Sequence, residues 1–198
     1  MIDREAAWQL LTEHVADSGL RRHMLAVEAA MRWYAADLGH DPQLWGIVGL
    51  IHDFDWEIHP TLPDHPLKGA DILRGRGVDE QIVRPILSHY EQGTNVPREQ
   101  PIDFALLACD EITGLLIACT LVRPGKDIGQ LTIKSIKKKW KDKSFAAGVD
   151  RQQVQDATAD FARECFDGSL DLWDHTANVL TAMQGAAAAL ELDGRAAG

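Results

Sequence analysis

Apolar residues recur at helical spacing along most of this 198-residue chain, and no stretch alternates apolar and polar positions as a half-buried strand would. Residues 19–38 have one apolar helix face, made of Leu20, Met24, Val27, Met31, Tyr34 and Leu38. Gly39 ends that helix, and Asp41 with Pro42 begins another that is apolar on most sides as far as His52. Further helices are predicted at 66–75, 79–90, 101–122, 131–141, 151–165 and 169–190, with loops at 58–66 and 93–101. The pattern predicts an all-α protein folded as a compact helical bundle.

The length fits a single domain with a substantial core, so we expect residues 1–198 to form one all-α domain. Within it, a core carrying the candidate site would cover about 19–125, and lysine-rich and C-terminal helices would cover about 126–190. The end of the chain, from Gly185, is rich in alanine and glycine, so we expect it to fray, with 191–198 as a frayed tail.

A formal net charge of −10 argues against general nucleic-acid binding and against an anionic membrane surface as partner. Residues 102–122 are apolar enough for a membrane span, but Asp103, Asp110 and Glu111 interrupt them, so a soluble central helix is expected. Three scattered cysteines and an N-terminus without the pattern of a signal peptide favour the cytoplasm. A homo-oligomer is left open.

Four polar residues fall where a helical core should be apolar: His23, His52, Asp53 and Asp110. An ionised carboxylate within an apolar helix is costly unless a partner compensates its charge. One divalent cation would compensate all four residues together. Two imidazoles and two carboxylates suit Mn, Fe, Co, Ni or Zn, with Mg as a further option.

Two further histidines extend this candidate site. His65 follows a proline-rich loop, and His89 ends the predicted helix over 79–90. If Asp53 bridges two ions, His65 and His89 can bind the second. Such a two-metal site polarises a phosphoryl group and activates water at neutral pH, which suits phosphoester hydrolysis. The sequence leaves open whether one ion binds or two.

The order His23, His52-Asp53, Asp110 resembles the H…HD…D signature of the HD superfamily of metal-dependent phosphohydrolases, and His65 and His89 resemble the added ligands of its binuclear branch. The runs 52–60, 65–69, 122–124 and 134–149 resemble a group of small predicted HD hydrolases of prokaryotes. The resemblance implies an all-α HD fold, a divalent metal cofactor and a phosphorylated substrate. Where the family commonly has HDIGK, this chain has His52-Asp53-Phe54-Asp55-Trp56, so the lysine is missing there and Lys68 is expected to contact phosphate in its place. Asp53 and Lys68 are therefore the predicted catalytic residues.

The sequence allows two interpretations of the role of several residues. Six of the eight lysines lie within 134–143, either as a rim that attracts phosphate or as a solvated helix face. Lys68, Arg123, Lys134 and Lys138 are the candidate substrate-binding residues. Asp55 and Glu57 either orient a ligand histidine or are solvated loop acids. His14, His40 and His175 are expected at the surface or its boundary.

The leading hypothesis is a phosphohydrolase that cleaves a phosphoester of a small phosphorylated molecule, such as a nucleotide, with a metal-activated hydroxide. One alternative is a di-iron oxygenase of the HD type, because the same ligands serve both reactions. The other is a non-catalytic nucleotide or metal sensor with the 134–143 helix as its partner surface. The sequence does not exclude the oxygenase, whereas the intact ligand set favours an enzyme over the sensor.

Overall fold

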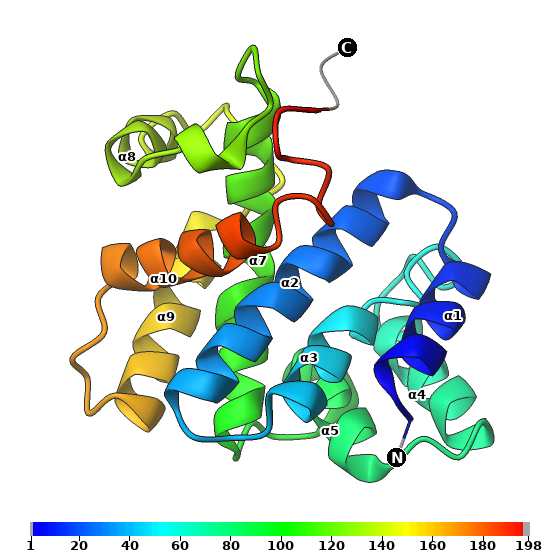
Figure 1. The fold of residues 1–198 in the computed structure, drawn as a ribbon. Helices are drawn as coiled ribbons and strands as arrows, with labels where there is room; N and C mark the ends of the chain where they lie inside the picture. The colour runs from blue at the N-terminus through cyan, green and yellow to red at the C-terminus, as the bar shows by residue number, and fades with distance from the viewer. Residues whose placement is uncertain (1, 196–198) are drawn as a thin grey trace. The chain divides into compact units, whose positions relative to one another are not determined.

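The computed structural model describes residues 2–195, and within that range it contains helices and no strand (Figure 1). The predicted all-α class is therefore confirmed. The chain divides into two compact units, the first running to Leu106 and the second starting at Leu107. Helix α7, Pro101–Leu121, passes through this division without a break. The expectation of one domain stays a prediction.

The first unit contains six helices and the start of α7: α1 Arg4–His14, α2 Ser18–Asp37, α3 Pro42–Ile51, α4 Asp64–Gly75, α5 Glu80–Ser88 and the short α6 Glu91–Thr94. Four of them begin after an aspartate whose side chain accepts a hydrogen bond from a backbone N–H of the first turn: Asp3, Asp17, Asp41 and Asp79. Such caps compensate amides that have no partner inside the helix. They fix where α1, α2, α3 and α5 start.

Helix α3 packs against both α1 and α2 (Figure 1). Gly49 permits the close approach to α2, because a Cβ atom there would lie 3.0 Å from the backbone of Val27 and of Glu28. A larger residue would push the two helices apart. This contact fixes the spacing between His23 on α2 and His52 at the end of α3.

The second unit contains the rest of α7, a short 3-10 helix Ile128–Gln130, α8 Ile133–Trp140, α9 Arg151–Cys165 and α10 Leu172–Gly185. Helix α10 packs against α8, α9 and the 3-10 helix. His175 on α10 is fully buried, and its Nε2–H donates to the carbonyl oxygen of Ala108 at 2.9 Å. Its expected surface position is wrong.

Two other expectations differ from the structure. Helix α1 was not predicted, although its buried residues Ala7, Leu10 and Leu11 have the i, i+3, i+4 spacing of an amphipathic helix. Fraying after residue 185 was also expected, yet Leu190 and Leu192 are buried and the Leu192 carbonyl accepts a hydrogen bond from the Ile128 amide at 2.8 Å. Alanine and glycine content did not reveal these two anchors. Residues 196–198 of the predicted tail lie outside the described range.

Helix α7 is long and apolar enough to cross a membrane by length and composition alone. However, 56% of its most apolar window is buried inside the protein, as in the core helix of a soluble protein. Its Asp103 is fully buried and accepts a hydrogen bond from Arg84 at 2.6 Å. Cytoplasmic location stays a prediction.

Candidate metal centre

Helices α2 and α3 supply His23 and His52, whose ring centroids are 5.5 Å apart. The backbone carbonyl of Gly49 accepts a hydrogen bond from Nδ1–H of the buried His52 at 2.9 Å. A neutral imidazole that donates through Nδ1 keeps its lone pair on Nε2. The fold of α3 therefore sets both the tautomer and the ring orientation of His52, as an outer hydrogen bond does for a metal ligand.

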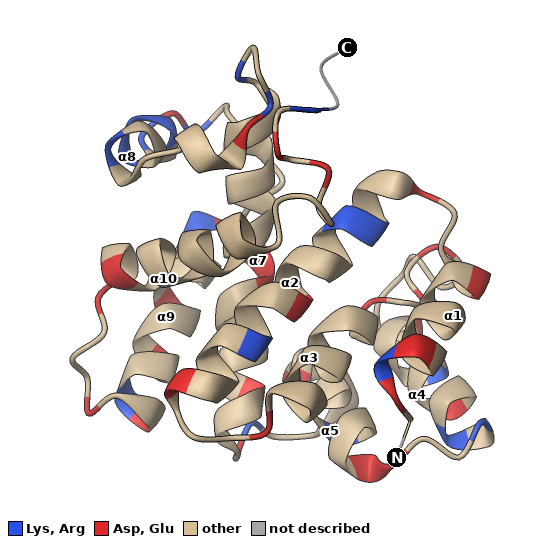
Figure 2. Ribbon diagram, in the orientation of Figure 1, with Lys and Arg blue, Asp and Glu red and all other residues tan. Residues whose placement is uncertain are grey.

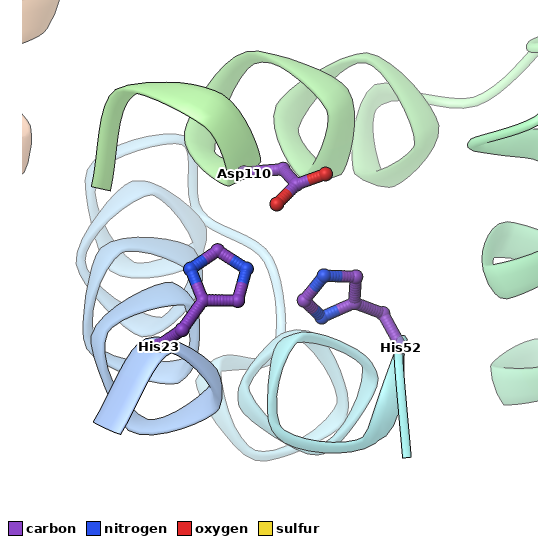
Figure 3. Close-up of side chains that lie close together, drawn as sticks. All are labelled: His23, His52 and Asp110. Carbon is purple, nitrogen blue, oxygen red and sulfur yellow. The ribbon is translucent and has the colours of Figure 1, made fainter. Parts of the chain in front are cut away.

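Figure 3 shows the side chains of His23, His52 and Asp110 close together. One potential ligand atom from each lies within 4.8 Å of the others. Asp110 is carried by α7, the helix that continues through residue 106. These are three of the four residues that the sequence assigns to a first ion.

The fourth, Asp53, belongs to a second group with His65 and His89, again with ligand atoms within 4.8 Å of one another. Asp53 Oδ1 is 3.1 Å from His65 Nε2 and 3.5 Å from His89 Nε2. The two Nε2 atoms are 3.2 Å apart. His89 is the C-cap that follows α5, and His65 stands in extended conformation in the first turn of α4, so the three side chains converge from three different segments.

Both histidines of this group have their other ring nitrogen occupied. His65 Nδ1–H donates to Asp55 Oδ1 at 2.8 Å, and His89 Nδ1–H donates to the Ile86 carbonyl. Asp55 is fully buried and packs against Gly69 of α4, where a Cβ atom would lie 2.5 Å from the carboxylate. Asp55 therefore orients His65, one of the two interpretations that the sequence left open.

The protonation of the group formed by Asp53, His65 and His89 depends on whether a metal cation is present. Burial disfavours ionised Asp53, but His52 and the neighbouring imidazoles outweigh it and hold its pKa well below the ordinary value. Burial likewise disfavours charged His65, yet Asp53 and Asp55 outweigh it and raise its pKa to about 9. Without a metal, a proton on His65 thus supplies the compensating positive charge.

A divalent metal fits this donor set. Asp53 Oδ1 is buried and makes no hydrogen bond of acceptable geometry, although two imidazole nitrogens lie beside it. A carboxylate oxygen and two imidazole lone pairs directed at one point are all acceptors, and only a cation satisfies them together. The mixture of nitrogen and oxygen favours a transition metal over Ca²⁺.

The two oxygens of Asp53 face different groups. Oδ1 faces His65 and His89, whereas Oδ2 is 3.6 Å from His52 Nε2. The rings of His52 and His89 are 5.8 Å apart, so the histidines of the two groups are neighbours in the first unit. This is the arrangement expected of a carboxylate that bridges two ions.

Comparison with known proteins agrees with this geometry. Residues 20–110 match the family model of the HD domain, and they include all six predicted ligands. Residues 20–110 form an HD domain. HD domains bind divalent metals and are usually metal-dependent phosphohydrolases.

Ribonuclease Y of Nitratidesulfovibrio vulgaris strain Hildenborough is 32% identical to the chain over 94 residues, and Ribonuclease Y of Oleidesulfovibrio alaskensis is 28% identical over 94 residues. These matches cover 47% of this chain but only 18% of each relative. No solved structure matches the chain significantly. The likeness to these relatives is therefore confined to about the length of an HD domain.

The remaining predicted site residues are not all near the HD ligands. Lys68 lies three residues after His65, is half exposed and pairs with Asp64 at 2.6 Å. Glu57 is exposed and accepts hydrogen bonds from the amides of Ala16 and Asp17, so it fastens the turn before α2 and orients no histidine. The other candidates belong to the second unit: Arg123 follows α7, and Lys134 and Lys138 are exposed on α8.

Sequence reasoning missed the roles of Gly49 and Gly69. A glycine inside a predicted helix was a signal for each, because it can mark a close approach. Without the fold, however, nothing identified the atoms that approach.

Proposed function

We propose that this chain is a metal-dependent phosphohydrolase that cleaves a phosphoester of a small phosphorylated molecule, with two divalent ions bridged by Asp53. The observation that carries the proposal is the two-sided environment of the Asp53 carboxylate. Its oxygens face His52 on one side and His65 with His89 on the other. Membership of residues 20–110 in the HD family supports the same chemistry.

The protein contributes to this chemistry by orienting the metal ligands and by keeping Asp53 negatively charged. When bound, the ions supply an activated water nucleophile and polarise the phosphoryl group. Asp53 stays ionised because its pKa is well below the ordinary value. Asp55 holds His65 with Nε2 directed at the site, and the Gly49 carbonyl does the same for His52. The ligands are therefore oriented before substrate arrives, which lowers the cost of organising the transition state.

Lys68 is the candidate for neutralising substrate phosphate. Its ion pair with Asp64 is solvent-exposed, and a pair of this kind contributes only about 0–1 kcal/mol. A phosphate group can replace Asp64 at low cost. The lysine is one turn of α4 beyond His65, within the element that carries that ligand.

The surface beside the ligands also carries exposed apolar side chains. Trp56 is 38% exposed, and its ring meets that of His65 edge-on at 5.0 Å. Ile58, Leu62 and Leu67 of the same segment are also exposed. We propose that these side chains pack against the apolar part of the substrate, which favours a nucleotide over a bare phosphorylated sugar. The similarity to ribonucleases supports including RNA among the substrates to be tested.

The test is metal analysis of the purified protein together with a screen of phosphomonoesters, nucleotides and short RNA. We expect Mn²⁺-loaded protein to hydrolyse at least one nucleotide, and His52→Ala and Asp53→Ala to abolish this. Asp71→Asn, a change at an exposed carboxylate of α4 outside the ligand set, should leave activity near the wild-type value. Activity that survives both ligand substitutions would refute the proposal.

The same preparation distinguishes the alternatives. An oxygenase requires bound iron and consumes oxygen with its substrate, whereas the proposed hydrolysis proceeds anaerobically with Mn²⁺. A sensor would bind nucleotide without turnover. No contact among residues 2–195 favours either alternative over hydrolysis.

A further inference from the structure

A shallow groove of about 430 Å³ runs along α8 in the second unit. It is lined by Ile133, Lys134, Lys137, Lys138 and Lys141. The helix stands out as a cluster of basic residues in Figure 2, in a protein whose net charge is −10. The four lysines are exposed and share one helix face, because they are three or four positions apart.

Several other basic residues of the chain have an acidic partner, whereas these lysines form no salt bridge within the described range. Arg74, Arg76 and Arg163 each pair with a carboxylate at the surface, and so does Lys68. Among the described residues, no carboxylate forms a salt bridge with any lysine of the groove. A chain with 30 acidic residues thus leaves these four cations unpaired. Like charges at this spacing repel one another, and an anion in the groove would relieve that repulsion.

The groove is also held in place. Thr132 and Ser135 form a capping box at the start of α8, and Ile136 anchors the helix in the core. Lys137 Nζ lies 4.8 Å from the ring centroid of Trp173 on α10, so its position is constrained by a cation–π contact. The helix and the Lys137 ammonium group therefore need little ordering when a ligand binds, which favours affinity.

We infer that this groove binds a small oligophosphate, recognised through its phosphates. Lys134 and Lys141 are separated by about 10 Å along the helix axis, the reach of a short chain of phosphates. The volume is within the range of small-ligand sites. Ile133 is the one apolar residue of the lining, and no aromatic side chain lines it, so a nucleobase has no platform there. A long polyanion would also meet the acidic remainder of the protein, whereas a small one need not.

The experiment measures binding of inorganic tripolyphosphate, ATP, GTP and orthophosphate to the EDTA-treated full chain by calorimetry, at low and moderate salt. Metal is removed so that the HD ligands do not capture phosphate. We expect tripolyphosphate, ATP and GTP to bind alike and orthophosphate far more weakly. The affinity should fall with added salt, because the attraction is between exposed charges.

The double variant Lys134→Glu/Lys138→Glu should weaken tripolyphosphate binding by about tenfold or more. Lys126→Glu is the matched control, since Lys126 is exposed and outside the groove, and it should change the affinity less than about twofold. Thermal unfolding of the ligand-free double variant should be no lower than that of the wild type, because a repulsion has been removed.

Two results would overturn the inference directly: the wild type does not bind tripolyphosphate, or the control variant weakens binding as much as the double variant does. A third arm measures single-stranded oligonucleotides of increasing length. If these bind more tightly than tripolyphosphate, and more tightly the longer they are, the groove is a nucleic-acid surface and the inference is overturned. Because every arm is metal-free and measures binding, failure here leaves the hydrolase proposal intact. Loss of hydrolysis with binding retained would refute only that proposal.

Discussion

Replacing Asp55 by asparagine should weaken metal binding without unfolding the protein. Asp55 is fully buried, and its Oδ1 accepts from His65 Nδ1–H at 2.8 Å. Asparagine keeps the shape and one acceptor oxygen, but it removes the negative charge that makes the imidazole a stronger ligand. The pKa of His65, about 9 in the wild type, should fall because one of its two carboxylate neighbours is neutralised.

Loss of such an outer carboxylate typically lowers metal affinity by about 10–100-fold, or about 1.4–2.8 kcal/mol. Asp55 also has a buried Oδ2 with no hydrogen bond, and the asparagine NH₂ would occupy that place. An unpaired buried donor costs about 1–3 kcal/mol, so the free energy of unfolding should fall modestly. The loss of metal affinity and the loss of stability follow from the same substitution, but they are measured by different experiments.

Affinity is measured by competition between the EDTA-stripped protein and a fluorescent chelator for Zn²⁺ or Mn²⁺ near pH 7, and stability by urea unfolding. Asp71→Asn is the matched control, the same carboxylate-to-amide change at an exposed position of α4 outside the ligand set, and should keep wild-type affinity. If Asp55→Asn also keeps wild-type affinity while His65→Ala loses it, the orienting role of Asp55 is refuted.

Three further outcomes are expected. Folding raises the pKa of His65 and favours its charged form. The metal-free protein should therefore lose up to about 3 kcal/mol of unfolding free energy as pH rises from about 6.5 through about 9. Urea unfolding measured across this pH range should show a flatter profile for His65→Gln. Burial lowers the pKa of His175 to about 4, so stability should instead be lost as pH falls from about 6.5 to about 4, and an unchanged acid profile in His175→Gln would contradict this. Gly69→Ala should lower metal affinity, because its Cβ would collide with the Asp55 carboxylate at 2.5 Å, whereas Gly75→Ala on the same helix meets nothing within 4 Å and should bind metal normally.

The sequence was sufficient to select His52 and Asp110 as candidate ligands because each breaks a local rule. His52 and Asp110 interrupt apolar helices, and only a shared cation explains both interruptions economically. The helices themselves followed from apolar periodicity, and α9 begins and ends where it was predicted, at residues 151 and 165. These features depend on local pattern, which the sequence contains directly.

Features that depend on tertiary contacts were not predictable in the same way. Asp55 and Glu57 are both acids in one loop, yet one is fully buried against His65 and the other accepts hydrogen bonds from the turn before α2. His175 has polar neighbours along the chain, and its burial follows from a carbonyl 67 positions away. In each case the deciding partner is remote in sequence, so no local pattern reveals it.

The hydrogen bonds of Glu57 to the amides of Ala16 and Asp17 join the loop that follows the ligand pair His52-Asp53 to the turn between α1 and α2. Whatever immobilises the loop should therefore slow hydrogen exchange at those two amides, about forty residues away in sequence. Coupling of binding free energies is reciprocal, so a substitution that loosens the turn should weaken metal binding. The N-terminal helix, which carries no ligand, would thereby contribute to how long the centre keeps its ions.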